Sequence, residues 1–87
     1  KTHILKIWPE FFDAIINGEK TFELRKDDRG YRANDILILC EWLPLKKKYT
    51  GRKISVKITY LLGGIGLSPD WVILGFKTFN ECTSQMK

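Results

Sequence analysis

Length, composition and charge already exclude several classes of protein. The chain has 87 residues and 10.2 kDa, which suits a single domain with one small hydrophobic core. Hydrophobic residues make up 44% of it, so a disordered or low-complexity protein is excluded. We find no apolar run of the roughly 18 residues that cross a bilayer and no leader pattern. Two cysteines and one histidine are too few for a disulfide framework or a zinc site, so we expect a cytoplasmic domain without metal or cofactor.

The positive charge is concentrated in the second half of the chain. Fifteen Lys and Arg against ten Asp and Glu give a formal net charge of +5 and a pI near 9.4. Six cations and no acid fall between Lys46 and Lys57. Charge of one sign in one stretch attracts polyanions by steering and by counterion release. The competing interpretation is a solvated hairpin whose lysines only keep a sheet edge from aggregating.

The first part of the chain predicts a strand, a helix and a second strand. Residues 3–7 alternate apolar and polar side chains as a strand does, and the lone His3 is expected at the strand start or on the surface. Pro9 suits the first turn of a helix, and Gly18 supplies the left-handed residue that ends it. Residues 20–26 alternate again and predict the second strand. The residues spaced for one buried helix face are Trp8, Phe11, Phe12, Ile15 and Ile16.

The remainder predicts three more strands and a tail. Residues 36–42 are almost wholly apolar, which indicates a strand covered on both faces. Residues 53–62 and 71–76 complete the set, whereas residues 78–87 lack any period and are expected to form a C-terminal tail. In the strand over residues 53–62, the side chains expected to point inward are Ile54, Val56, Ile58 and Tyr60.

Five short strands and one helix indicate an α+β, strand-rich fold. So small a sheet protects its edges by curling, so we expect a barrel of five to six strands with the helix packed at its side. No linker or repeat divides the chain, and we expect a single domain over residues 1–77.

Three ionisable residues follow the expected end of the helix. Lys20 stands at the start of the second strand, and Glu23 and Arg25 share one face of it, opposite Phe22 and Leu24. If Phe22 and Leu24 fill the core, the charged pair points outward into a polar cleft between barrel and helix. There the arginine can bind a phosphate, the glutamate can accept hydrogen bonds, and the lysine can act as a cation or, when desolvated, as a base. The alternative is a structural ion pair between Glu23 and Arg25, with Lys20 in water.

The spacing Gly18-x-Lys20-x-x-Glu23-x-Arg25 resembles the signature of the ASCH domain, a member of the PUA-like superfamily of small β-barrels. The sequence around it is similar to the short phage and bacterial ASCH-like proteins grouped as domain of unknown function 3850. The similarity runs over residues 3–77. The segments that carry it are the run HxLK-x-WPExF (His3, Leu5, Lys6, Trp8, Pro9, Glu10, Phe12), Arg25-Lys26-x-Asp28-Arg29, Asp35-Ile36-Leu37, Tyr49-Thr50-Gly51-Arg52 and Gly64-x-Gly66-Leu67.

This resemblance implies a cleft beside the first helix that holds RNA or a nucleotide-like ligand and is lined by Lys20, Glu23 and Arg25. Lys6 and Tyr31 are further candidates for ligand binding, and Trp71 is a candidate for stacking on a base. We expect a monomer or weak dimer that does not enter a membrane. Along the basic stretch, the residues expected to follow the phosphate backbone of a nucleic acid are Lys46, Lys47, Lys48, Arg52 and Lys53.

The resemblance also implies an alternative function, because some ASCH-like proteins are enzymes. Certain members cleave single-stranded RNA, and small acetylcytidine amidohydrolases have a lysine matching Lys20 and a threonine nucleophile where this chain has Glu23. A carboxylate is poorly suited to that amide chemistry. The alternative function is therefore a metal-independent ribonuclease or nucleoside hydrolase with Lys20 and Glu23 as an acid–base pair. A second alternative is a protein-interaction module of phage origin.

Overall fold

The computed structural model describes residues 1–79, so the expected tail over residues 78–87 lies, apart from its first two residues, outside the described part. Within residues 1–79 there are five strands and one helix. That helix has eight residues, and nothing in this range is a helix long enough to cross a membrane. The elements are β1 (Thr2–Ile7), α1 (Pro9–Ile16), β2 (Phe22–Lys26), β3 (Ile36–Leu43), β4 (Lys48–Gly63) and β5 (Trp71–Thr78).

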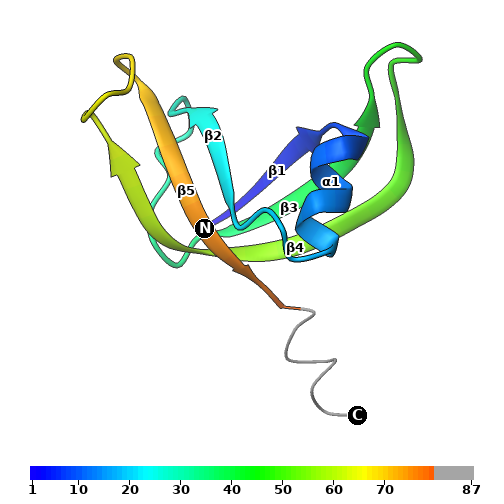
Figure 1. Cartoon of the computed structure of the whole chain (residues 1–87), viewed down its shortest axis with the longest axis horizontal. Coiled ribbons are helices and arrows are strands. Elements are labelled where there is room, and N and C mark those ends of the chain that lie inside the picture. Colours follow the sequence, from blue (N-terminus) through cyan, green and yellow to red (C-terminus); the bar gives the residue numbers. More distant parts are fainter. Residues whose placement is uncertain (80–87) are drawn as a thin grey trace.

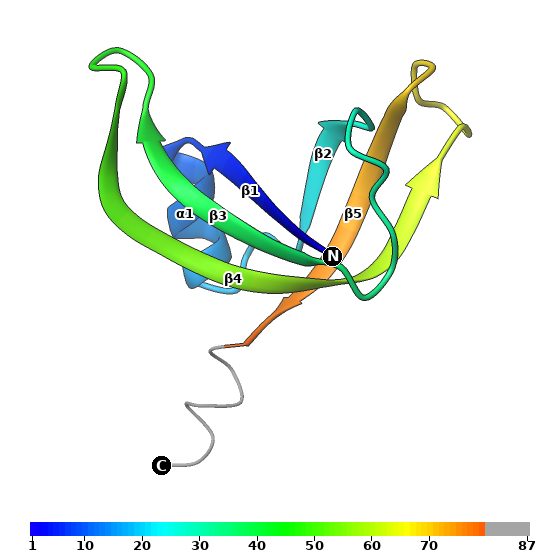
Figure 2. The same cartoon turned by 180° about the vertical axis from the view of Figure 1, so that it is seen from behind.

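The five strands form one sheet in the order β1-β3-β4-β5-β2. β1 pairs with β3 in parallel, and the other neighbours pair antiparallel. The long strand β4 follows the curve of the sheet, so the sheet bends into a half-barrel that leaves β1 and β2 as its two edges (Figure 1). From behind, β3 and β4 present the outer surface and α1 lies on the far side (Figure 2). The prediction of a small strand-rich domain with one main helix is confirmed.

The hydrophobic core fills the hollow of the curled sheet. Alternate residues of each strand point into it, so the register brings Leu37 between His3 and Val56, and Leu39 between Leu5 and Ile54. The opposite face of β3 is only half-buried, so the expectation that both its faces are covered holds for the inner face alone. The buried hydrophobic residues are Leu5, Ile7, Phe12, Ile15, Tyr31, Leu37, Leu39, Ile54, Val56, Ile58, Leu74 and Phe76.

The helix begins and ends where the sequence predicts, but it buries less of its apolar stripe. Pro9 opens α1, and Gly18 adopts φ +79° just beyond its end and donates its N–H to the carbonyl of Ile15 at 3.1 Å. Only Phe12 and Ile15 reach the core. An eight-residue helix lying on a narrow sheet has only about two turns to bury. The apolar residues of the stripe that remain exposed are Trp8, Phe11 and Ile16, which corrects the prediction of one continuous buried face.

The faces of β2 are the reverse of the expected ones. Glu23 is buried, whereas Phe22 and Leu24 are nearly half exposed. When side chains alternate along a strand, the pattern alone does not say which set faces the core. The residues that pack against each set decide which one points inward. Here two cations accompany Glu23 into the hollow, which offsets the cost of burying its charge.

Tyr60 also faces outward, against the prediction. The pairing of β4 with β5 shifts register between Ile58 and Tyr60, as at a β-bulge. One extra residue at this point exchanges the two faces of the strand. Ile54, Val56 and Ile58 therefore point inward as predicted, and beyond the shift Leu61 takes the inward place of Tyr60.

Candidate functional site

A cleft of about 750 Å³ opens between the two edge strands of the half-barrel, β1 and β2. Because β2 is an edge, residues from both of its faces reach the cleft. The start of α1 and the loop after β2 complete its walls. Five basic residues and two acidic ones line it, and its aromatic residues are Trp8, Phe11, Phe22, Tyr31 and Trp71. A concave site with apolar walls and a few converging charges is typical of a small-ligand or nucleobase pocket.

Lys20, Glu23 and Arg25 converge in this cleft. The carboxylate of Glu23 accepts hydrogen bonds from Lys20 Nζ at Oε1 and from Arg25 Nε at Oε2, the latter at 3.0 Å. The side chain of Glu23 is 7% exposed, against 17% for Lys20 and 25% for Arg25. The shared carboxylate therefore holds two cations at fixed positions in a partly dry site, and the cluster keeps one net positive charge.

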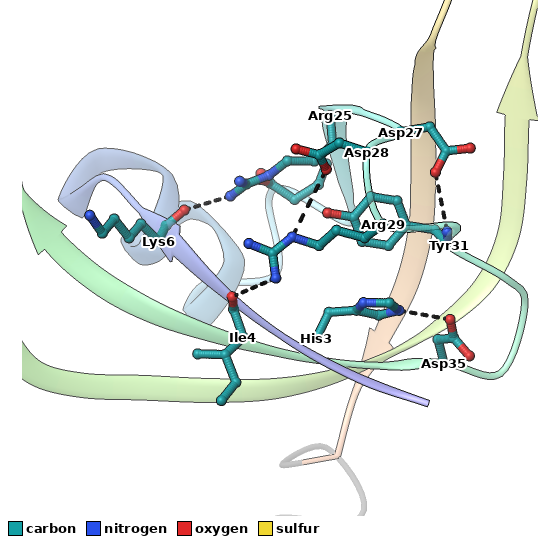
Figure 3. Close-up of polar contacts among 10 residues, drawn as sticks. His3, Ile4, Lys6, Arg25, Asp27, Asp28, Arg29, Tyr31 and Asp35 are labelled. Atoms are coloured by element: carbon teal, nitrogen blue, oxygen red, sulfur yellow. Dashed lines mark hydrogen bonds and ion pairs between the residues drawn. The ribbon is translucent and has the colours of Figure 1, made fainter.

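Two arginines, one on β2 and one in the loop after it, reach the edge strand β1 across the opening, where no backbone ladder joins β1 and β2. Arg25 Nη2 donates to the carbonyl of Lys6 at 2.5 Å, and Arg29 Nη1 donates to the carbonyl of Ile4 at 3.3 Å (Figure 3). Carbonyls on an exposed sheet edge invite pairing with another strand, and side chains that occupy them prevent it. We call this pair of contacts the arginine clasp. Arg29 also lies 3.9 Å from a carboxylate oxygen of Asp28.

Aromatic side chains surround the lysine of the cluster. Lys20 Nζ lies 5.2 Å from the ring centroids of both Phe11 and Phe22, within the range of cation–π attraction. Trp8 stacks on Phe11 with 6.1 Å between centroids and 15° between planes. These rings are 40 to 50% exposed, and that of Trp71 is 39% exposed. Exposed ring faces beside fixed cations suit a flat, anionic ligand.

Lys6 and Tyr31 line the cleft, but their side chains are otherwise engaged. The ammonium of Lys6 lies 3.9 Å from the ring centroid of Trp42 on the neighbouring strand. The ring of Tyr31 is buried and meets the ring of His3 edge-on at 4.8 Å. Burial raises the pKa of the Tyr31 hydroxyl above its ordinary value, so it stays protonated at neutral pH.

His3 lies at the start of β1, as one of the two expectations had it, but it is buried and not on the surface. Its Nε2 lies 2.9 Å from Asp35 Oδ2. Figure 3 marks this contact with a dashed line. The same oxygen accepts the backbone N–H of Arg32 at 3.1 Å. The hydrogen bond from His3 is the main cause that lowers the pKa of Asp35 to about 2.

The predicted phosphate-tracking residues divide between two environments. Lys46 and Lys47 lie in the turn between β3 and β4 and Lys48 is the first residue of β4; all three are exposed, and Lys53 is exposed on the outer face of the sheet. Arg52 instead binds the buried Glu41 through Nε and Nη2, both at 2.8 Å, and reaches Asp13 of α1 at 2.9 Å.

Arg52 therefore serves to fix the hairpin to the helix. Its guanidinium carbon lies 4.6 Å from the ring centroid of Phe12, and Thr50 Oγ1 donates to the same carboxylate of Glu41 at 2.6 Å. The hydrogen bonds from Arg52, followed by that from Thr50, lower the pKa of Glu41 to about 2. We call Asp13, Glu41, Thr50 and Arg52 the hairpin cluster.

The sequence alone does not identify several contributors to the cleft, among them Arg29, Trp8 and Phe11. Arg29 follows an acidic pair that reads as a turn, and its contact with β1 crosses 25 positions of sequence. Trp8 and Phe11 fit the helix periodicity, which predicts that they lie in the core. The one available signal was length, because a helix of about two turns cannot bury five large apolar side chains.

Comparison with known proteins finds a family and a relative for this chain. The family model described as "Domain of unknown function (DUF3850)" matches residues 2–76. A protein of Escherichia phage P2, titled "Uncharacterized 12.9 kDa protein in GpA 3'region", is 38% identical to the chain over 74 residues. The match covers 85% of this chain and 66% of that protein, so the chain spans slightly less than two thirds of the relative's length.

Proposed function

The chain belongs to the DUF3850 family, and on that premise we propose that its cleft binds RNA or a nucleotide-like ligand. We further propose that the half-barrel is an ASCH-like member of the PUA-like superfamily. The observation that carries the proposal is the Lys20–Glu23–Arg25 cluster, because it lines the same cleft as exposed aromatic rings and its lysine lies 5.2 Å from those of Phe11 and Phe22. Fixed cations beside ring faces match the two parts of a nucleotide, its phosphate and its base.

In this proposal each member of the site has a separate role. Arg25 offers its planar guanidinium to a phosphate or a base carbonyl, for which it exchanges its bond to the Lys6 carbonyl. Lys20 contributes a second positive charge, and Glu23 orients both cations and accepts a hydrogen bond from a base or a ribose hydroxyl. The ring of Trp8 or of Trp71 stacks on the base.

The test is fluorescence anisotropy with labelled single-stranded RNA at about 50 to 200 mM salt. Four phosphate contacts predict a log–log salt slope near −3, from roughly −0.7 for each contact. Arg25→Ala is expected to weaken binding about tenfold or more, since a charge-assisted bidentate contact is lost. Arg32→Ala is the matched control, because Arg32 is exposed and lies outside the cleft lining. Binding that ignores both salt and the Arg25 substitution would refute the proposal.

A hydrolase is the second candidate, favoured by the direct contact between Lys20 and Glu23 in a site of low exposure. A lysine and a carboxylate in contact can exchange a proton between them during RNA or nucleoside hydrolysis. Incubation with labelled RNA, with and without EDTA, tests this. Turnover that disappears in Lys20→Ala supports the hydrolase, whereas RNA that stays bound and intact rules it out for that substrate.

A further inference from the structure

A second apolar surface lies on the outside of the sheet, beyond the edge of the cleft. In the register of β2, β5 and β4, Leu24 pairs with Ile73, which pairs with Leu62. Pairs that lie directly opposite share a face of the sheet, so these side chains adjoin one another. We call this surface the outer apolar face, and its members are Phe22, Leu24, Tyr60, Leu62, Trp71 and Ile73.

The outer apolar face is exposed to an unusual extent for apolar residues in a strand. Phe22, Leu24 and Trp71 are 39 to 49% exposed, and Tyr60 is 68% exposed. The register shift before Tyr60 is what turns Tyr60 and Leu62 outward. A contiguous apolar patch maintained at the cost of a bulge is typical of a binding surface.

Gly75 leaves a slot in the end row of this face, between Phe22 and Tyr60. Both Phe22 and Tyr60 pair with Gly75, so the two rings stand on either side of a position without a side chain. A Cβ placed there would lie 3.6 Å from the carbonyl oxygen of Tyr60 and 3.9 Å from its Cβ, which is ordinary contact. The fold therefore has room for a side chain at position 75. Close approach of a flat ligand to the backbone, in contrast, requires that the position carry no side chain. Two strand spacings, about 10 Å, separate the backbones of β2 and β4 that carry the rings, which is enough for one base.

Positive charge adjoins the slot on the same face. Lys57 pairs directly with Lys77, and both are exposed and point outward, next to the row of Tyr60, Gly75 and Phe22. Like charges directly opposite each other destabilise a sheet unless an anion lies between them. At the far end of the face, Lys26 pairs with Trp71. The face therefore combines rings with cations, in the manner of sheets that bind single strands.

The outer apolar face is also continuous with the cleft. Phe22, Leu24 and Trp71 line the cleft from the edge of β2 and belong to the outer apolar face as well. A strand bound in the cleft can therefore pass over β2 without leaving an apolar surface. The basic pair and the net charge of +5 disfavour a second copy of the chain in this place.

We propose that the outer apolar face binds a second segment of the same single-stranded RNA, with a base in the Gly75 slot and a phosphate between Lys57 and Lys77. This inference rests on the proposed function and makes it more specific. The ligand class becomes a single strand of several nucleotides in place of a free nucleotide.

The experiment compares two probes, UMP or AMP and an oligouridylate or oligoadenylate of about eight nucleotides. Tyr60→Ala is expected to weaken oligonucleotide binding by about 5- to 100-fold and to leave mononucleotide binding unchanged. Tyr60→Leu, which keeps apolar area and loses the ring, is expected to do the same. Gly75→Ala is expected to weaken oligonucleotide binding with the fold intact. Ile4→Ala is the matched control, since Ile4 is 60% exposed and lies on the other edge strand.

Three results would overturn this inference, and they differ from one another. If mononucleotides bind but the Tyr60 variants bind the oligonucleotide as the unmodified protein does, the cleft stands and the outer apolar face has no part. If neither probe binds, the proposed function fails and the inference fails with it. If the protein sediments as a dimer that Tyr60→Ala dissociates and Tyr60→Leu preserves, the face packs against a second copy instead.

Discussion

Replacement of Glu41 by Gln tests the hairpin cluster as a source of stability. Interactions with Arg52 and Thr50 lower the pKa of Glu41 from 4.5 to about 2 in the folded protein. Each pKa unit corresponds to about 1.4 kcal/mol, so the charged carboxylate contributes about 3 kcal/mol to the free energy of unfolding. That is a large fraction for a domain of this size, whose total is on the order of 5–15 kcal/mol.

The pH dependence has a definite sign. Because the folded pKa lies below the unfolded value, the contribution is complete above about pH 5 and is lost as the pH falls toward 2. Glu41→Gln should therefore be about 3 kcal/mol less stable than the unmodified protein at pH 7. The two proteins should converge in stability near pH 2. Urea unfolding followed by tryptophan fluorescence measures the difference across this range.

Asp13→Asn is the matched control. Asp13 binds the same guanidinium but its side chain is 58% exposed, so its loss should cost less than about 1 kcal/mol. A difference between Glu41→Gln and the unmodified protein that stays constant from pH 7 to pH 2 would refute the electrostatic explanation. It would point instead to packing of the glutamate side chain.

Two further predictions concern the His3 pair and the basic hairpin. Asp35→Asn should lower the free energy of unfolding by about 2 kcal/mol at pH 7 and by much less near pH 2, because the pKa of Asp35 is about 2 in the folded protein against 3.8 ordinarily. Thermal unfolding at the two pH values measures the loss, and an equal loss at both would contradict this prediction. Combined substitution Lys46→Ala, Lys47→Asn and Lys48→Ala should make the salt slope of RNA binding shallower by about 2 without loss of stability. Asparagine is used because Lys47 has φ +51°, and an unchanged slope would show that the hairpin does not contact phosphate.

The sequence predicts those elements whose signals are local. Pro9 and Gly18 delimit α1 because their backbone preferences act within one turn. The alternation over Ile54, Val56 and Ile58 gives the buried face of β4 because the core lies on one side of it only. The expected similarity to domain of unknown function 3850 is confirmed by the match over residues 2–76.

What the sequence does not predict depends on partners that are distant along the chain. The faces of β2 follow from cations that accompany Glu23, and Tyr60 turns outward through a register shift that no local pattern indicates. In the sequence Arg52 is one more cation of the basic stretch. Its structural role becomes visible only in the fold, where it binds Glu41, eleven positions away. The convergence of Lys20, Glu23 and Arg25 could be expected from their spacing, whereas the part of Arg29 in the arginine clasp could not.

The short helix α1 contacts both the cleft and the hairpin cluster. Phe11 lies beside the ammonium of Lys20 in the cleft, and Asp13, two residues later, binds Arg52 of the hairpin cluster. Truncation of the hairpin would therefore remove an anchor of α1 and loosen the wall on which a ligand in the cleft depends. An engineered variant that exchanges the hairpin for another should retain Arg52 and its two acidic partners, or the cleft will change along with the loop.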